Sequence, residues 1–414
     1  MKAVVFTLGC KVNQYEGQAI IDALRAHGVL AVPDIEYADR YVFNTCSVTA
    51  EADKKSRQLL AKAAKLNPAA PVYIIGCSSQ NRPEQYRGKP NVRFIGGTAA
   101  KDKVVERILS DAPPAEEIAA LPSVYEELCA VGHTRARAYI KVQDGCNNFC
   151  SYCIIPYLRG RSRSRGTADI LAEARTAAGT TGEIVFTGVN LSAYGRDTGG
   201  SLTELIGALG EIRVRKRLGS LECGVIDETL LKTMRAAGFC DHFHLSLQSG
   251  SDGVLRRMNR HYTAAEFLGK IDLIRAQFPN AGITTDVIAG FPGETEAEHA
   301  ETLAFLERAA FSDMHVFPYS ERAGTKAAGL PQLDRSVRQR RAAEIAAVGR
   351  RLRERFIAAQ LGRQLPVYYE ECVDGQAQGF TENYIKVYAD ALPGQVSDTR
   401  LLRPYQEGVL GEIV

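Results

Sequence analysis

The segment "DGCNNFCSYC" carries three cysteines that are close enough to bind one metal centre. Cys146, Cys150 and Cys153 have the spacing C-x3-C-x2-C, and a compact loop with this spacing can present three thiolates to one face of an iron–sulfur cube. Zinc is the alternative, but zinc sites usually have a fourth Cys or His, and none follows at zinc-finger spacing. Three thiolates on a four-iron cluster leave one iron open, and an open position on a metal is a reaction site.

A second set of three cysteines stands at the ends of apolar stretches. Cys10 ends "AVVFTLGC", Cys46 ends "YVFNTC" and Cys77 ends "VYIIGC". Because the carboxyl ends of parallel strands meet at one edge of a sheet, these three thiols can converge. The other four cysteines are interpreted as structural: Cys129, Cys223, Cys240 and Cys372.

The elements that position the second set lie in residues 1–110. Apolar strand patterns there alternate with helical patterns, at 14–27 and 50–66 among others. This alternation predicts an α/β domain with a Rossmann-like parallel sheet. Residues 111–134 are interpreted as a linker because the segment "SDAPPAEEIAALPS" interrupts the pattern.

The first cysteine set follows the first strand of a second α/β alternation, which covers residues 135–360 and ends in a long Arg-rich helix at 334–360. It predicts a partial (βα)6 barrel. Residues 361–414 contain short strand patterns with the turn signals "VDGQ" and "LPGQ", which predict a small β-barrel. The strands of the central domain are expected at "AYIKVQ", "EIVFTG", "RLGSLE", "HFHLSLQ", "ITTDVIAG" and "MHVFPY".

Composition favours a cytoplasmic protein. The 414 residues are 45% hydrophobic with a net charge of +3. No apolar run has the length of a membrane span, and the N-terminus lacks a basic segment followed by an apolar signal core. In a reducing compartment, ten cysteines are expected to include metal or redox ligands rather than structural disulfides.

The run "YIKVQDGCNNFCSYCIIPYLRGRSRSR" resembles the radical S-adenosylmethionine (SAM) enzymes. The segments "FTLGCKVNQYEG", "VFNTCSVTAEADKKSRQ" and "IIGCSSQNRPE" resemble the N-terminal domain of the methylthiotransferases. The resemblance extends over essentially the whole chain, and "GCKVNQYE" and "CSVTAEADKKSR" resemble the subfamily that acts on N6-threonylcarbamoyladenosine in tRNA. The sequence departs from the family pattern at Ser78 and Ser79 and at Cys223, none of which is a ligand.

The resemblance implies an enzyme with two [4Fe–4S] clusters, one on each cysteine set, and with SAM as cofactor. It would add a methylthio group to C2 of N6-threonylcarbamoyladenosine in the tRNA anticodon loop. Reduced flavodoxin or a ferredoxin-type protein would supply electrons, and the protein is expected to be a monomer without a membrane partner. Two alternatives stay open: a methylthiotransferase that modifies an aspartate of a ribosomal protein, and a non-enzymatic RNA-binding protein with structural zinc.

Candidate SAM contacts follow several strands. On "HFHLSLQ", alternation puts His242, His244, Ser246 and Gln248 on one polar face, which suits a lined lumen. The glycine turn of "FTGVN" and the loop "VIAGFPGETE" allow close backbone approach to a ligand. The expected cofactor-binding residues are Tyr152, Thr187, Gly188, Ser246, Gln248 and Gly290.

Candidate RNA contacts lie directly after the cysteine loop. In "RGRSRSR", alternating Arg on an extended segment can contact phosphates from one face. The Arg-rich helix is a second candidate. The C-terminal domain resembles the TRAM RNA-binding module, but it is acidic, so it would use aromatic stacking through Tyr368, Tyr369, Phe380, Tyr384 and Tyr388. The predicted RNA-binding arginines are Arg159, Arg161, Arg163 and Arg165.

Overall fold

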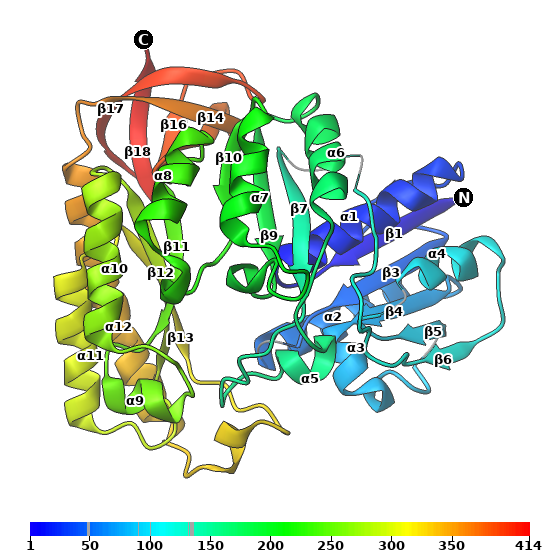
Figure 1. Cartoon of the computed structure of the whole chain (residues 1–414). Coiled ribbons are helices and arrows are strands. Elements are labelled where there is room, and N and C mark those ends of the chain that lie inside the picture. The colour runs from blue at the N-terminus through cyan, green and yellow to red at the C-terminus, as the bar shows by residue number, and fades with distance from the viewer. Residues whose placement is uncertain (48–49, 90, 100, 131, 133–135) are drawn as a thin grey trace.

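A computed structural model describes residues 1–47, 50–89, 91–99, 101–130, 132 and 136–414. They form an N-terminal parallel sheet, a central array of parallel strands and a C-terminal closed barrel (Figure 1). Within these residues, no helix is both long and apolar enough to cross a bilayer.

Among the described residues, six strands form the N-terminal parallel sheet in the order β2-β1-β3-β4-β5-β6. Apolar side chains cover both faces, with Val5 and Ile75 on one face and Phe43 and Ile74 on the other. This explains why the strands are continuous apolar runs. The elements are β1 (Lys2–Thr7), α1 (Lys11–Ala26), β2 (Leu30–Val32), β3 (Arg40–Thr45), α2 (Ala50–Leu66), β4 (Val72–Gly76), α3 (Cys77–Asn81), η1 (Pro83–Gln85), β5 (Val92–Gly96), α4 (Asp102–Leu109) and β6 (Ala115–Glu117).

The N-terminal sheet continues past residue 110, into the segment that was expected to be a linker. β6 pairs in parallel with β5, with Phe94 opposite Ala115. Glu116 forms an ion pair with Arg87, and Glu117 pairs with Arg107. A short, charged strand at the edge of a sheet has no apolar alternation to reveal it. The predicted boundary at 110 is therefore wrong by this one strand.

The central domain has an open array of parallel strands, as the sequence predicted. Residues 136–414 are described without a gap, and in them β8 pairs antiparallel with β7, which begins the parallel order β7-β9-β10. Two isolated bridges then join the β10 edge of this sheet to β11-β12-β13. The strands are β7 (Arg137–Asp144), β8 (Arg163–Ser164), β9 (Glu183–Gly188), β10 (Arg215–Leu218), β11 (His242–Gln248), β12 (Gly282–Ala289) and β13 (Asp313–Pro318). The helices are α5 (Ile155–Arg159), α6 (Thr167–Ala178), η2 (Leu191–Ala193), α7 (Leu202–Ala208), η3 (Leu209–Glu211), η4 (Cys223–Val225), α8 (Glu228–Ala236), α9 (Asp252–Arg257), α10 (Ala264–Gln277), α11 (Glu296–Ala309), η5 (Lys326–Gly329) and α12 (Arg335–Ala358).

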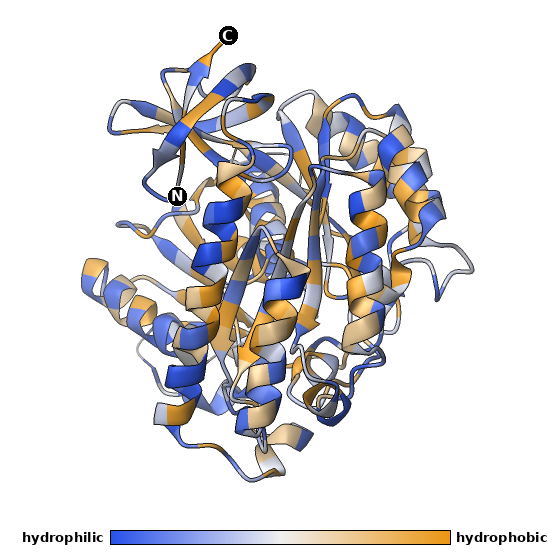
Figure 2. Ribbon diagram, turned by 90° about the vertical axis from the view of Figure 1, so that its left-hand side faces the viewer, coloured by the Kyte–Doolittle hydropathy of each residue, from blue (hydrophilic) through white to orange (hydrophobic). Residues whose placement is uncertain are grey.

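Alternation along the central strands separates an apolar outer face from a polar inner face. Ile140 and Val142 of β7 pack with the surrounding helices, as do Phe243 and Leu245 of β11. In Figure 2 the central strands carry both orange and blue segments, and the helices around them show blue on their outer sides. Lys141 of β7 points the other way and forms an ion pair with α1 of the N-terminal domain. The N-terminal domain therefore covers the inner face of β7.

Five strands of the C-terminal domain form a closed barrel in the order β14-β15-β16-β18-β17. Closure pairs every edge and lets a small all-β unit bury a core of its own, which includes Val367, Tyr369 and Leu401. The strands are β14 (Gln364–Val373), β15 (Gln376–Thr381), β16 (Lys386–Ala389), β17 (Val396–Tyr405) and β18 (Gly408–Ile413).

The C-terminal barrel is docked at the amino ends of the central strands. Arg215 donates to the carbonyls of Pro366 and Phe380, and Arg217 donates to the carbonyl of Thr381. Both guanidinium groups pair with the buried Glu183 at the start of β9. The opposite, carboxyl ends of the strands are left for the cysteine loop.

Candidate active site

The strand-end triad consists of Cys10, Cys46 and Cys77. They follow β1, β3 and β4, which are neighbours in the sheet. The backbone at Gly9 has φ +96°, and a Cβ there would lie 2.6 Å from Cys46 Sγ, so the chain before Cys10 lies against Cys46. Cys10 is also close enough to Cys77 to affect its pKa electrostatically. The structure thus brings the three predicted ligands to one edge of the sheet.

Cys77 is the deepest member of the strand-end triad. Burial raises the pKa of its thiol, and the nearby Arg159 guanidinium and Lys101 ammonium partly offset this effect. Both cations favour a thiolate at this position. Cys10, in contrast, is exposed, so the triad has a closed side and an open side.

The loop triad consists of Cys146, Cys150 and Cys153, directly after β7. Burial raises the pKa of the Cys146 thiol and raises that of Cys153 to about 12, and the neighbouring sulfurs add to both shifts. Metal binding must therefore displace protons from these thiols. Phe149 adopts φ 47°, which bends the loop between the first two cysteines.

N–H groups point at the loop sulfurs. Asn148 N lies 3.5 Å and Asn190 Nδ2 lies 3.7 Å from Cys146 Sγ, and Arg260 Nη1 lies 3.4 Å from Cys150 Sγ. Hydrogen bonds to cluster sulfurs are a standard feature of iron–sulfur sites. The donor set and its surroundings therefore fit a cluster.

Sequence reasoning missed two residues beside the loop triad. Arg260 Nη1 also lies 3.1 Å from Glu222 Oε1, and Asn148 Nδ2 donates to the same oxygen. Glu222 follows β10 and remains partly exposed. A carboxylate directly after a strand of the array was the available signal.

Gln143 is a third missed residue, and it organises the turn that leads to the loop triad. Its side-chain amide donates to the carbonyls of Asp144 and Gly145 and accepts from Asn190 N at 2.7 Å. A Cβ at Gly188 would lie 2.8 Å from Gln143 Oε1, so glycine is needed there for close packing. Gln143 was not recognised because it lies within an apolar strand pattern.

The expected SAM contacts are brought together only in part. Thr187 is buried and Gly188 half-buried beside Gln143, and Tyr152 packs with Phe291 under the loop. Burial raises the pKa of Tyr152 well above its usual value. Their roles in binding SAM stay predictions.

The predicted face of β11 is interrupted. His242 and His244 share a face, but the register between β11 and β12 shifts between Leu245 and Gln248, and Gln248 adopts φ 70°. The predicted alternation holds as far as Leu247, because Phe243, Leu245 and Leu247 all pack in the apolar core, and it is interrupted at Gln248. The Ser246 carbonyl oxygen accepts a hydrogen bond from Arg260 at 3.1 Å, which ties β11 to the loop triad.

Gly290 is explained by helix packing. It has φ +69°, and a Cβ there would lie 2.6 Å from Arg338 Cγ and 2.9 Å from Arg338 Cα. Helix α12 therefore occupies the space that a side chain would need at this position, which explains the glycine. A role of Gly290 in binding SAM stays a prediction.

Three of the four predicted RNA-binding arginines are buried. Arg159, Arg163 and Arg165 are 1%, 3% and 4% exposed. Arg163 pairs with Asp144, and Arg165 pairs with Glu173. Their guanidinium groups cannot reach a phosphate in this fold. Arg159 ends helix α5 and Arg163 lies on the short strand β8, so the predicted row of phosphate contacts on one extended face is wrong. Arg161 alone of the four is exposed, with its guanidinium 4.5 Å from the Phe149 ring centroid.

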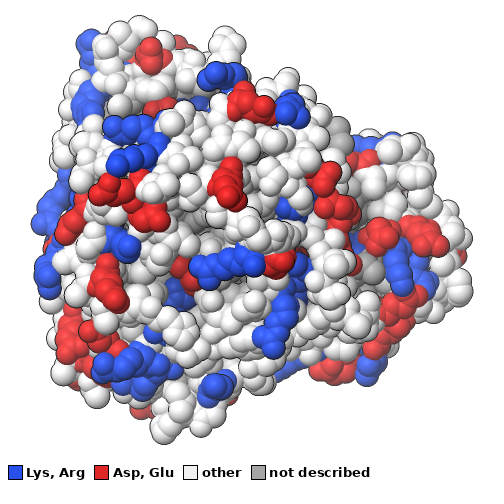
Figure 3. Space-filling model, viewed as in Figure 1, with Lys and Arg blue, Asp and Glu red and all other residues white. Residues whose placement is uncertain are grey.

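Helix α12 is also less cationic than its composition indicates. Arg341 is buried against Glu294, and Arg351 and Arg355 both pair with Glu307 of α11. On the face seen in Figure 3, positive and negative side chains are interspersed rather than gathered into a basic patch. The helix uses its arginines mainly to dock on the central domain.

The aromatic residues of the C-terminal barrel are engaged inside the protein. Tyr369 and Tyr388 are buried in the barrel, and Tyr368 Oη donates to the carbonyl of Ala136 at 2.7 Å. Tyr384 stacks on His242 with ring centroids 4.3 Å apart, and Phe380 stacks on Tyr384. The five rings that were candidates for RNA stacking thus form core and domain interface.

Arg159 joins the two triads through a buried ionic network. It follows the loop triad on α5 and reaches α1, where its Nη1 lies 3.0 Å from Glu16 Oε1, and it also pairs with Asp144 at 3.1 Å. Burial opposes ionisation of Glu16, but Arg159, Lys101 and Lys141 outweigh it and hold the pKa of Glu16 well below its usual range. The Arg159 side chain therefore links the surroundings of Cys77 in the N-terminal domain to the central domain, which carries the loop triad.

Comparison with known proteins identifies the class and the family. Residues 140–306 match the Radical SAM superfamily, and residues 2–97 match Uncharacterized protein family UPF0004. The radical SAM methyltransferase TsrM from Kitasatospora setae, determined with cobalamin and a [4Fe-4S] cluster bound, has a similar fold, with a TM-score of 0.56 at 15% identity over 79% of this chain and 77% of that chain. The parallel array with a cysteine triad after its first strand is that of a radical SAM enzyme.

Relatives of the same length refine this class. The chain is 35% identical to threonylcarbamoyladenosine tRNA methylthiotransferase MtaB of Bacillus subtilis, over 100% of this chain and 97% of the relative. It is 36% identical to the protein of that name from Thermotoga maritima, over 99% and 96%. It is 32% identical to tRNA-2-methylthio-N(6)-dimethylallyladenosine synthase of Syntrophobacter fumaroxidans, over 99% and 95%. The chain belongs to the radical SAM tRNA methylthiotransferases, enzymes that transfer a methylthio group, and a non-enzymatic zinc protein is therefore excluded.

Proposed function

We propose that this enzyme adds a methylthio group to C2 of N6-threonylcarbamoyladenosine next to the anticodon. The observation that carries the proposal is that both triads border one inner face of the central domain. The loop triad is tied to β11 through Arg260, and Lys11, which follows Cys10, is close enough to Asp286 of β12 to affect its pKa. A base held on this face would lie between the two triads.

We infer that each triad holds one [4Fe–4S] cluster and that SAM binds beside the loop triad. When bound there, cluster and SAM together supply a deoxyadenosyl radical that can abstract hydrogen from an unactivated C–H bond. The protein itself contributes positioning. Arg260 and Asn190 direct N–H groups at loop sulfurs, and Gln143 fixes the turn before Cys146.

The RNA would present its target base from a single-stranded loop, where unstacking costs little. The exposed Arg161 beside the loop triad is suited to a phosphate contact. We further propose a TRAM-like role for the C-terminal barrel, a reduced flavodoxin or ferredoxin-type electron donor, and a cytoplasmic monomer as the working form.

The test uses anaerobically reconstituted enzyme with SAM and a reductant. The substrates are anticodon stem-loops of one sequence that carry threonylcarbamoyladenosine, dimethylallyladenosine or adenosine at the target position, together with a ribosomal-protein peptide that contains the candidate aspartate. Nucleoside and peptide mass spectrometry should detect the methylthio product only on the threonylcarbamoyl RNA. Product on the dimethylallyl RNA or on the peptide alone would overturn the proposal.

A further inference from the structure

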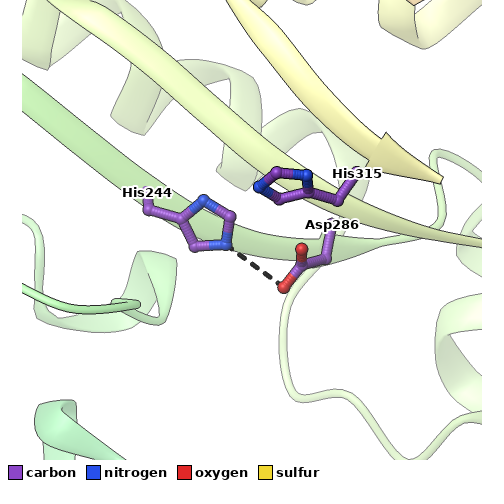
Figure 4. Close-up of side chains that lie close together, drawn as sticks. All are labelled: His244, Asp286 and His315. Carbon is purple, nitrogen blue, oxygen red and sulfur yellow. Dashed lines mark hydrogen bonds and ion pairs between the residues drawn. The ribbon is translucent and has the colours of Figure 1, made fainter. Parts of the chain in front are cut away.

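A second polar cluster lies on the inner face of β11, β12 and β13. His244, Asp286 and His315 each offer a polar atom, and these atoms all lie within 4.8 Å of one another (Figure 4). Strand register explains this convergence, because Asp286 is directly opposite His315 and His244 is opposite Thr284, two residues before Asp286. The predicted catalytic machinery uses none of these side chains.

One side of this cluster is held rigidly. His244 Nδ1 lies 2.9 Å and His242 Nε2 lies 3.0 Å from Thr284 Oγ1, and His244 Nε2 lies 3.1 Å from Asp286 Oδ2. Burial and the nearby Arg217 lower the pKa of His242 well below its usual value. Both nitrogens of the His244 ring are occupied, so this ring positions Asp286.

The other side of the cluster is open. His315 is exposed, and its ring centroid lies 5.8 Å from that of His244. The Asp286 side chain is 27% exposed. Burial alone would raise the pKa of Asp286, but the hydrogen bond from His244 and the nearby His315 and Lys11 hold it below its usual value. An ionised carboxylate and an exposed imidazole therefore face the same space, and the Lys11 ammonium is near enough to act electrostatically on the carboxylate.

This combination fits a polar organic group better than a metal ion. His244, Asp286 and His315 have the donor types of a divalent cation site. However, His244 is already committed to Thr284 and Asp286, and the Lys11 ammonium would repel a cation. A ligand with both hydrogen-bond donors and an anionic acceptor would satisfy all of the open groups.

We propose that Lys11, His315 and Asp286 recognise the threonyl substituent of the target nucleoside. Lys11 and His315 donate to its carboxylate, and Asp286 accepts from its hydroxyl or urea N–H. This inference rests on the proposed function and adds the residues that select the substrate. A dimethylallyl substituent would leave these polar groups without partners, and such sites reject apolar analogues strongly.

The experiment measures binding of the reconstituted holoenzyme to stem-loops by fluorescence anisotropy. One RNA carries threonylcarbamoyladenosine and a matched RNA carries its methyl ester, which removes the negative charge and little else. Wild type should bind the free acid about tenfold more tightly than the ester, as expected for a charge-assisted hydrogen bond. The Lys11→Gln variant should lose most of this ratio, Lys11→Arg should restore it, and Asp286→Asn should weaken binding of both RNAs.

The matched control is Lys89→Gln, which removes the same charge from an exposed lysine of the same domain. It should leave the acid-to-ester ratio unchanged, and the iron content of every variant should match wild type. If wild type methylthiolates the threonylcarbamoyl RNA but Lys11→Gln keeps the wild-type ratio of acid to ester affinity, the proposed pocket is contradicted. The proposed function is unaffected by that result. Stoichiometric binding of Zn²⁺ or Mn²⁺ that His315→Ala abolishes would also overturn the pocket. Failure of wild type to modify this RNA would overturn the proposed function, and the pocket with it.

Discussion

The loop triad and the strand-end triad are held by different parts of the fold. Cys146, Cys150 and Cys153 share one loop, and their positions depend on the local turn that Gln143 fixes. Cys10 and Cys77 come from separate strands, so their approach depends on the whole N-terminal sheet and on the buried network around Arg159. A triad on one loop therefore tolerates changes elsewhere in the fold. A triad assembled from separate strands is sensitive to every contact that holds the sheet in place.

The largest effects should come from removing each triad. Replacing Cys146, Cys150 and Cys153 with Ala should abolish SAM cleavage and remove about half of roughly eight irons per reconstituted chain, because one of two clusters is lost. Replacing the strand-end triad should also halve the iron but leave SAM cleavage intact and stop methylthiolation. Iron analysis, deoxyadenosine formation and nucleoside mass spectrometry separate these outcomes. Sulfur insertion by the strand-end variant would contradict the role given to that triad.

Arg159→Met should be the most damaging single change to the strand-end triad. It leaves Glu16 and Asp144 buried without their main partner, which costs about 3–5 kcal/mol of unfolding free energy. Denaturation curves with fluorescence detection should show this loss together with reduced iron at the strand-end triad. The neighbouring Arg161→Met is the control, and its change should be within about 0.5 kcal/mol because this side chain is exposed. Equal losses of unfolding free energy in the two variants would show that the ionic network around Arg159 does not stabilise the fold.

Acid should weaken the contact between the two domains. The pKa values of Glu16 and Asp144 are held below their usual range, because Arg159 and Lys141 outweigh the effect of burial. A carboxyl group whose pKa is lowered by folding contributes its full share of the unfolding free energy above its unfolded-state pKa of about 4. This contribution is lost as the pH falls towards its folded-state pKa. Thermal midpoints should therefore fall steeply below pH 4 in wild type and less steeply in Glu16→Gln. A thermal midpoint that rises as the pH falls through this range would contradict the prediction.

Tyr384→Ala should weaken the docking of the C-terminal barrel rather than RNA stacking. The ring stacks on His242 at 4.3 Å and lies 5.2 Å from the Arg137 guanidinium. Loss of the ring should lower the unfolding free energy by about 1–3 kcal/mol, which would appear as a lower thermal midpoint. The effect on RNA affinity should be smaller. Tyr405→Ala, in the same barrel but packed on Tyr388, is the control that leaves this interface intact. A large loss of RNA affinity without loss of stability would restore the stacking interpretation.

The smallest effect is expected at Arg161. Its replacement by Ala should lower the slope of log affinity against log salt by about one phosphate contact, with little change in stability. Arg235→Ala is closely matched, since that arginine is also exposed and lies 4.8 Å from a phenylalanine ring, but on α8. Arg235→Ala should leave the slope unchanged. Equal slopes for both variants would remove Arg161 from the RNA contact.

Much of the fold could be predicted because hydrophobic pattern determines element type. Helix α2 begins and ends where the periodicity indicated, and five of the six parallel strands of the central domain match their predicted segments to within a residue. The sixth, β10, begins two residues before the predicted segment "RLGSLE" and shares only Arg217 and Leu218 with it. β6 was missed because a three-residue edge strand with two glutamates has no apolar period. The bulge in β11 was missed because alternation assumes a regular strand.

By itself, the sequence determined the six candidate cluster ligands, the order of the domains and the family, because cysteine spacing and strand ends are local features. Tertiary structure alone decided what the charges do. Arg159, Arg163 and Arg165 were expected at the surface, yet each lies beside a buried carboxylate on another element, α1, β7 or α6. It also brought Asp286 and His315 together, with Lys11 near enough to act electrostatically on Asp286. The physical reason is that a charge is stable inside a protein only with a partner, and a linear sequence does not say which partner the fold will provide.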